Sequence, residues 1–234
     1  LKPGLLVLGV AVSAGAFALR GRSCSAGNAT GTLRPPSPGS LRESSVNAGI
    51  SLGMALNWHA VQTDAEYIPA LLRDFDAVTL ENASKWGTVE HTEGTYDWSR
   101  ADQLVALAQS HGLSVRGHPL IWDEHVPAWV PPTVDATRFR DLSDAYLEAA
   151  VHRYEGRIST WDVVNELIED DGQPSTAPFF TLRGPDQAER AFALARAQDP
   201  HARLFVNDFA VGWDNPRSRG LEELVRRWKK AGVP

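Results

Sequence analysis

The sequence predicts an α/β fold in which parallel strands alternate with helices. Five short apolar runs have the length and composition of buried parallel strands. Amphipathic segments separate these runs, and alternating strand and helix implies parallel strands joined by crossover helices. A closed barrel needs eight such units, typically about 250 residues, whereas five units fit between residues 50 and 234. Two architectures therefore remain open at this point, a smaller open sheet and the first five units of a barrel.

Each expected strand stops on polar or aromatic residues. The strands with the residues that follow them are Ser51–Leu56 before Asn57, Trp58 and His59; Ala77–Leu80 before Glu81 and Asn82; Ser114–Gly117 before His118; Trp161–Val164 before Asn165 and Glu166; and Ala202–Val206 before Asn207 and Asp208. A Glu at the end of a buried strand is costly to desolvate unless it is paired or used. In α/β barrels this end of the strands carries the chemistry. The five endings therefore predict a shared rim that can hydrogen-bond a hydroxyl-rich ligand.

The expected helices carry apolar residues at helical spacing. They cover Ala65–Phe75, Trp98–His111, Asp141–Tyr154, Gln187–Gln198 and Ser218–Lys230. Ser143 is a possible cap of the third helix. The basic residues near the end of the last helix are typical of a solvated face that suits the helix dipole.

The residues before the first expected strand have a different composition. Lys2 precedes the apolar run Leu5–Leu19, in which Ala16-Phe17-Ala18 has the form of a signal peptidase site. Residues 1–19 are therefore expected to be a signal peptide or, alternatively, an N-terminal anchor, which predicts a secreted or cell-envelope protein without stable membrane association after signal removal. Residues 20–48 are rich in Ser, Gly and Pro and predict a flexible or semi-extended linker. Residues 49–234 form the α/β domain.

Composition limits the classes of partner. The net charge of −6 argues against nucleic-acid binding, which needs clustered Lys and Arg. Eight tryptophans are a high count, and aromatic faces are surfaces on which sugar rings stack. Cys24 is the one cysteine, so no intrachain disulfide can form.

Four segments in register resemble glycoside hydrolase family 10, the xylanase-type (β/α)8 barrels. They are Glu81-Asn82-Ala83-Ser84-Lys85-Trp86, Arg116-Gly117-His118-Pro119-Leu120-Ile121-Trp122, Trp161 to Glu166, and Leu204-Phe205-Val206-Asn207-Asp208. The resemblance covers residues 50–234. It implies a TIM barrel, of which about the first five β/α units are present. It also implies retaining endo-hydrolysis of β-1,4-xylan or xylo-oligosaccharides by the complete protein, without a cofactor or metal, and we expect a monomer.

The resemblance assigns roles to individual residues. Glu166 is the acid/base, Asn165 bonds the 2-hydroxyl of the sugar at the cleavage site, and His118 and Trp122 line the same subsite. Glu81, Asn82 and Lys85 hold the next sugar; the alternative interpretation of Glu81 and Lys85 is a simple ion pair. Trp86 is expected in the core. Asn207 and Asp208 are expected to support the site from behind.

Two departures from the family pattern stand out. Asp123 occupies a position that commonly carries His, which affects details of the loop. The family's nucleophile is a Glu that ends the seventh strand, beyond the five units counted here. The 234 residues alone are therefore expected to be inactive.

Two alternatives remain from other functional classes. The first is a non-catalytic carbohydrate-binding barrel that keeps the groove without a nucleophile. The second, less favoured, is a metal-dependent barrel hydrolase with ligands drawn from His59, His118, Asp123, Glu124 and His125. Such a site needs several of these side chains to converge from different strand ends.

Overall fold

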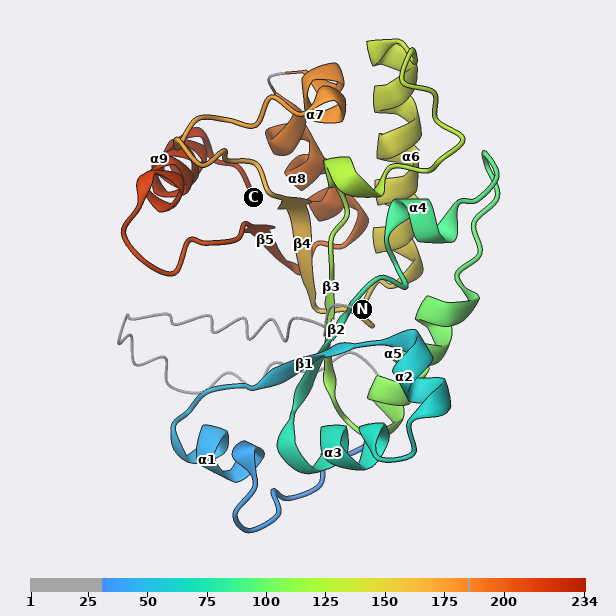
Figure 1. Ribbon diagram of the computed structural model, residues 1–234, viewed down its shortest axis with the longest axis vertical. Helices are drawn as coiled ribbons and strands as arrows, with labels where there is room; N and C mark the ends of the chain where they lie inside the picture. Colours follow the sequence, from blue (N-terminus) through green and yellow to red (C-terminus); the bar gives the residue numbers. More distant parts are fainter. Residues whose placement is uncertain (1–30, 185) are drawn as a thin grey trace, which may run out of the picture.

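The computed structural model describes residues 31–184 and 186–234, and its centre is a five-stranded parallel sheet (Figure 1). The strands are β1 Gly53–Leu56, β2 Ala77–Leu80, β3 Ser114–Gly117, β4 Thr160–Asn165 and β5 Arg203–Asn207. Their order across the sheet is their order along the chain, and every neighbouring pair is parallel. The predicted strands at residues 77–80 and 114–117 are found with the same bounds.

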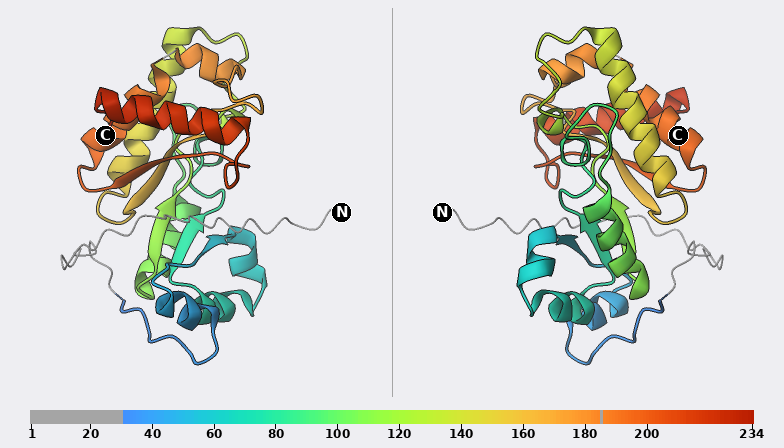
Figure 2. Two further views of the ribbon diagram at one scale, coloured as in Figure 1. Left: turned by 90° about the vertical axis from the view of Figure 1, so that its left-hand side faces the viewer. Right: turned by 90° about the vertical axis from the view of Figure 1, so that its right-hand side faces the viewer.

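Helices lie before, between and after the strands, and those between successive strands form the crossover connections. They are α1 Leu41–Asn47, α2 Trp58–Thr63, α3 Tyr67–Asp74, α4 Trp86–Val89, α5 Ser99–Ser110, the short 3-10 helix η1 Asp123–His125, α6 Ala136–Arg153, α7 Pro178–Arg183, α8 Gln187–Gln198 and α9 Pro216–Ala231. In Figure 2, α9 extends lengthwise across the left view. None of the helices in the described part of the chain is long and apolar enough to cross a bilayer.

The order of the strands decides between the two architectures that the sequence leaves open. In a doubly wound open sheet the strand order reverses at a switch point. Here each strand is added on the same side of the previous one, and right-handed crossovers then place the connecting helices on one face of the sheet. This winding is that of a (β/α)8 barrel, so the prediction of a partial TIM barrel is confirmed.

Strand β4 lies deepest in the sheet. All six of its residues are buried; α8 packs against it, and α6 packs on α8. At the end of β3, Gly117 pairs with Trp161, and a Cβ on Gly117 would lie only 2.1 Å from the Trp161 ring. A glycine is therefore required there for the indole to fit. Since this close contact fixes β4 against β3, the residues at the carboxyl end of β4 start from a rigid base.

The strand register brings the polar endings to one rim. Leu56 pairs with Leu80, so Asn57 and Glu81 follow at the same level. Asn165 pairs directly with Asn207 across β4 and β5. The carboxyl ends of parallel strands point the same way, and the predicted rim is therefore a physical edge of the sheet.

The predicted helix at 65–75 is found as α3. A second short helix that the sequence does not predict, α2, precedes it, and Asn57 caps α2 by accepting from Ala60 N at 2.9 Å. Helix α6 starts at Ala136, where Asp135 accepts from Arg138 N at 2.9 Å. The prediction of Ser143 as a cap is wrong. Ser143 is buried inside the helix, and its hydroxyl donates to Arg140 O at 3.0 Å.

The linker predicted over residues 20–48 contains a helix in its second half. Helix α1 is capped by Ser40, which accepts from Glu43 N at 3.1 Å. Arg42 is 2% exposed and donates to the carbonyls of Arg34, Pro35 and Phe75. A buried arginine, and not an apolar stripe, anchors this helix, which is why hydrophobic periodicity does not reveal it. The signal or anchor predicted at residues 1–19, the linker residues 20–30 and Cys24 lie outside the described residues.

Candidate active site

Glu166 occupies the first position after β4 in an unusual backbone conformation. Its φ angle is 61°, and Glu166 and Ala210 are the non-glycine residues with positive φ in the described part of the chain. Its amide donates to Asn207 O at 2.9 Å, which ties the turn to β5. A left-handed conformation in a residue with a side chain stores about 1 kcal/mol or more and is concentrated at functional sites. The neighbouring strand β5 therefore stabilises a backbone conformation at Glu166 that the residue would rarely adopt by itself.

The Glu166 carboxylate is held by an indole. Trp122 Nε1 donates to Glu166 Oε2 at 2.8 Å. The Trp122 ring stacks on His125 with centroids 5.0 Å apart, and Lys85 Nζ lies 4.4 Å from the centroid of the indole. Burial lowers the pKa of Lys85, and the carboxylates of Glu81 and Glu166 oppose this effect. The site thus places an apolar wall and a cation beside the carboxyl group.

Asn165 is oriented by its partner on the next strand. Its side chain is buried, and its Oδ1 accepts from Asn207 Nδ2 at 2.8 Å. Because the carbonyl end of the amide is engaged in this way, the Nδ2 group is left as the donor for another acceptor. Asn207 therefore supports both Asn165, through its side chain, and Glu166, through its backbone carbonyl.

His118 is fixed by a buried carboxylate. Its Nδ1 lies 2.9 Å from Asp162 Oδ2, and Arg116 Nε donates to the same oxygen at 2.8 Å. A second Arg116 nitrogen donates to Asp162 Oδ1. Burial alone would raise the pKa of Asp162, but the hydrogen bonds from His118 and Arg116 hold it below its ordinary value. This carboxylate orients the imidazole with its other nitrogen free for a ligand.

The residues after β2 do not form the simple ion pair considered above. Glu81 Oε2 accepts from Asn57 Nδ2 at 2.5 Å, whereas Lys85 Nζ donates to Asn82 Oδ1 at 2.8 Å. Asn57 and Glu81 follow the paired residues at the ends of β1 and β2, whereas Lys85 lies just before α4 and bonds Asn82. Glu81 and Asn82 line a cavity of about 190 Å³, together with Asn57, Trp58, His59, Ala83, Thr88 and Arg100. Trp86, as predicted, is in the core, stacked on Tyr146 at 5.7 Å.

Asp208 lies beneath the loop that follows Glu166. It accepts from Ile168 N at 3.0 Å and from Arg217 Nη1 at 2.9 Å. Arg217 also donates to Ile168 O and, at 2.9 Å, to Asp170. Burial raises the pKa of Asp208, and these hydrogen bonds oppose the rise. The pair Asp208–Arg217 therefore fixes both backbone groups of the residue two positions after Glu166.

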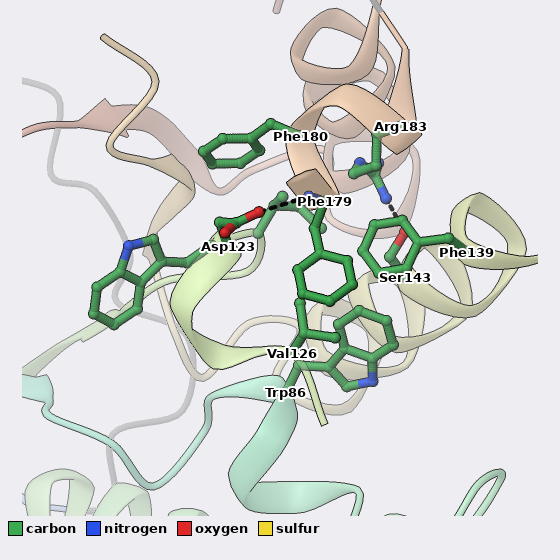
Figure 3. Close-up of a pocket in the computed structure, with 10 residues that line it drawn as sticks. Trp86, Asp123, Val126, Phe139, Ser143, Phe179, Phe180 and Arg183 are labelled. Carbon is green, nitrogen blue, oxygen red and sulfur yellow. Dashed lines mark hydrogen bonds between the residues drawn. The ribbon is translucent and has the colours of Figure 1, made fainter. Parts of the chain in front are cut away.

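Asp123 joins two elements behind the site. Its Oδ1 accepts from Phe179 N at 2.8 Å and so connects η1 to α7 (Figure 3). Phe179 stacks on Phe139 with centroids 4.9 Å apart, and the cavity between these side chains is only about 10 Å³. A cavity of this size is too small for a sugar, and the side chains around it pack against one another. The departure at Asp123 therefore has a local structural role.

The side chains of the metal-dependent alternative do not converge. In residues 31–184 and 186–234, no group of three or more His, Cys, Asp or Glu side chains is placed to hold a metal ion. His118 is bonded to Asp162, Asp123 bonds Phe179 N, and His125 stacks on Trp122. The arrangement favours a rim of hydrogen-bonding and aromatic groups.

The structure gives a role at the candidate site to Asn57, which the sequence places on the rim without a role, and to three residues that the sequence does not assign: Arg116, Asp162 and Arg217. Asp162 has a signal in the sequence, since an acid within a buried apolar strand needs a partner. Its partner, Arg116, becomes evident only when β3 and β4 are placed in register. Arg217 has no such signal, because it lies in the first turn of α9, far along the chain.

Comparisons with known proteins agree with this geometry. The family model for glycosyl hydrolase family 10 matches residues 40–234. Endo-1,4-beta-xylanase 3 of Hypocrea jecorina is 40% identical over 162 residues, which are 69% of this chain and 47% of that protein. Endo-1,4-beta-xylanase A of Xylanibacter ruminicola is 36% identical over 187 residues, 77% of this chain and 50% of that protein. The chain spans about half the length of these relatives.

Solved structures give the same result. The crystal structure of xylanase 10B from Thermotoga petrophila RKU-1, in complex with xylobiose, superposes with a TM-score of 0.78 at 26% identity and covers 86% of this chain and 62% of that one. Native xylanase 10B from Thermotoga maritima gives a TM-score of 0.77 at 28% identity, covering 83% of this chain and 61% of that one.

Proposed function

The chain belongs to glycosyl hydrolase family 10, and from this premise we propose that the protein cleaves β-1,4-linked xylan chains internally, with retention of configuration. The observation that carries the proposal is the carboxyl group of Glu166, held by Trp122 Nε1 at the end of the most buried strand. Beside it, the Asn165 Nδ2 group has no acceptor within residues 31–184 and 186–234. Relatives named as endo-1,4-beta-xylanases support the choice of substrate.

Glu166 is proposed to act first as an acid and then as a base. A retaining glycosidase uses two carboxyl groups about 5 Å apart. The nucleophile attacks the anomeric carbon, while the acid gives its proton to the departing glycosidic oxygen. The resulting carboxylate then takes a proton from water, which attacks the anomeric carbon and releases the nucleophile. By the family resemblance, the nucleophile is a Glu on the seventh strand, outside residues 1–234.

The neighbouring side chains suit the binding of a sugar at the cleavage site. Asn165 Nδ2 is proposed to donate to the 2-hydroxyl, a contact that strengthens as the oxocarbenium character develops. His118, oriented by Asp162, is proposed as a hydrogen-bond partner in the same subsite. The indole of Trp122 forms its apolar wall.

The next sugar toward the non-reducing end is proposed to bind Glu81, Asn82 and Lys85. These three side chains present acceptors, an amide and an ammonium at the end of β2. Asn207 and Asp208 are proposed to support the site from behind. The protein is further proposed to act as a monomer, exported by residues 1–19, on xylan or xylo-oligosaccharides.

The test is Glu166→Gln in the protein expressed from its complete gene. Activity on xylan, whose leaving group needs a proton, should fall by a factor of about 10² to 10⁴. The kcat/KM for an aryl xyloside with an acidic phenol as leaving group, which reports the first step, should fall far less, because that phenol departs without a proton. Glu223→Gln, at an exposed position on α9, is the matched control and should leave both rates unchanged. Equal loss on both substrates would contradict the acid role.

A further inference from the structure

The cavity at the ends of β1 and β2 extends beyond the residues proposed to hold a sugar. Glu81 and Asn82 line part of its volume of about 190 Å³. Another part is lined by Trp58 and His59 from α2 and by Arg100 from the first turn of α5. This second group includes a permanent cation, and the proposed function assigns it no role.

Arg100 differs from most arginines in the described part of the chain. Arg116, Arg183 and Arg217, for example, each donate to a carboxylate. Within residues 31–184 and 186–234, no side chain or backbone group accepts a hydrogen bond from Arg100, although the positive charge helps to lower the pKa of Asp97 after the larger effect of Ser99. The guanidinium therefore keeps its donors available at the border of the cavity.

The other charges around the cavity are already engaged. Glu81 Oε2 is bonded to Asn57 Nδ2, and Asp97 Oδ1 accepts from Ser99 N at 2.9 Å. An anion that enters the cavity would be repelled by Glu81 and attracted by Arg100. The two side chains are therefore suited to different parts of one ligand, a hydroxyl-bearing ring for Glu81 and an acidic group for Arg100.

We propose that Arg100 binds the carboxylate of a uronic acid branch carried by the xylan chain, so that the cavity favours acidic over neutral xylan. A planar guanidinium matches a carboxylate with two parallel hydrogen bonds. Trp58 offers an aromatic surface for the branch ring, and His59 offers a second polar group. This inference rests on the proposed function, since it requires the main chain to bind at Glu81 and Asn82.

The expected preference is modest, because Arg100 is exposed. The attraction between unit charges about 4 Å apart in water corresponds to about a fivefold change in Kd. The preference should shrink as salt is added, since exposed charges are screened within about 10 Å at 0.1 M.

The experiment measures binding and does not depend on turnover. The protein from its complete gene, carrying Glu166→Gln to prevent cleavage, is titrated calorimetrically with xylotetraose and with xylotetraose that bears one glucuronic acid branch. At low salt the acidic ligand should bind about fivefold more tightly. Adding Arg100→Gln should remove this preference. Arg227→Gln, an exposed arginine on α9, is the matched control and should keep it.

The outcomes separate the two proposals. If both ligands bind equally well to the parent protein, or if Arg100→Gln leaves the preference intact, the inference about Arg100 is overturned while the proposed function stands. If neither ligand binds, the proposed function fails and the inference fails with it. A preference that persists unchanged at 0.5 M salt would also overturn a charge-based origin.

Discussion

Replacement of Arg217 by Met should destabilise the protein through Asp208. The Asp208 side chain is fully buried and the Arg217 side chain is 7% exposed, and 2.9 Å separates Arg217 Nη1 from Asp208 Oδ1. Removing one partner of a buried ion pair costs about 3–5 kcal/mol, because the remaining charge is left without compensation. Asp208 keeps the hydrogen bonds from Ile168 N and Phe209 N, so a loss near the lower end, about 3 kcal/mol, is expected. Asp170, 93% exposed, contributes little.

The pH dependence identifies the source of this loss. The pKa of Asp208 is already raised by burial, and removal of the cation raises it further. A carboxyl group whose folded-state pKa is raised destabilises the fold when it is ionised, and this penalty disappears as the pH falls through that pKa. The deficit of Arg217→Met should therefore be largest at neutral pH and should shrink on acidification.

The assay is chemical unfolding followed by tryptophan fluorescence across a pH series. Arg217→Met/Asp208→Asn is the companion variant, in which no buried charge remains. It should recover most of the lost free energy of unfolding, because removing both members of a buried pair is often close to neutral. A deficit below about 1 kcal/mol, a deficit that grows in acid, or a double variant as unstable as the single one would refute the reasoning.

Two further predictions concern the rim. Arg116→Met removes hydrogen bonds that hold the pKa of Asp162 low. The stabilisation from these bonds is present above the pKa of Asp162 in the unfolded chain and is lost as the pH falls through its pKa in the folded protein. The variant should therefore lose about 2 kcal/mol of stability at neutral pH and should unfold at a higher pH in an acid titration followed by circular dichroism. An unchanged acid midpoint would count against it. Trp122→Phe keeps a ring but removes the donor to Glu166, and kcat on xylan should fall about tenfold or more. Trp213→Phe, at an exposed position, should have no such effect.

Much of the framework could be predicted from the sequence because it depends on local pattern. The strands at residues 77–80 and 114–117 and the helix at 187–198 have the predicted bounds. Each has a regular apolar spacing with an abrupt polar end, which is the information that a short window of sequence contains. The position of Glu166 after β4 follows from the same kind of signal.

What the sequence left out depends on partners far along the chain. Glu81 accepts a hydrogen bond from Asn57, and not from Lys85, because the register of β1 and β2 places Asn57 beside it. No local sequence spacing predicts this partner. Arg42 anchors α1 by donating hydrogen bonds to carbonyl groups, and the helix lacks the apolar stripe from which it could have been predicted. Predictions based on hydrophobic pattern thus systematically miss the polar and charged side chains that hold elements together.

The left-handed backbone at residue 166 sets stability and chemistry against each other. At a φ of 61° a glycine would have a lower conformational free energy than a residue with a side chain. Laboratory evolution that selects only for heat tolerance should therefore drift toward Gly at this position and remove the proposed proton donor. Thermostable libraries of this protein need a screen for turnover at every round.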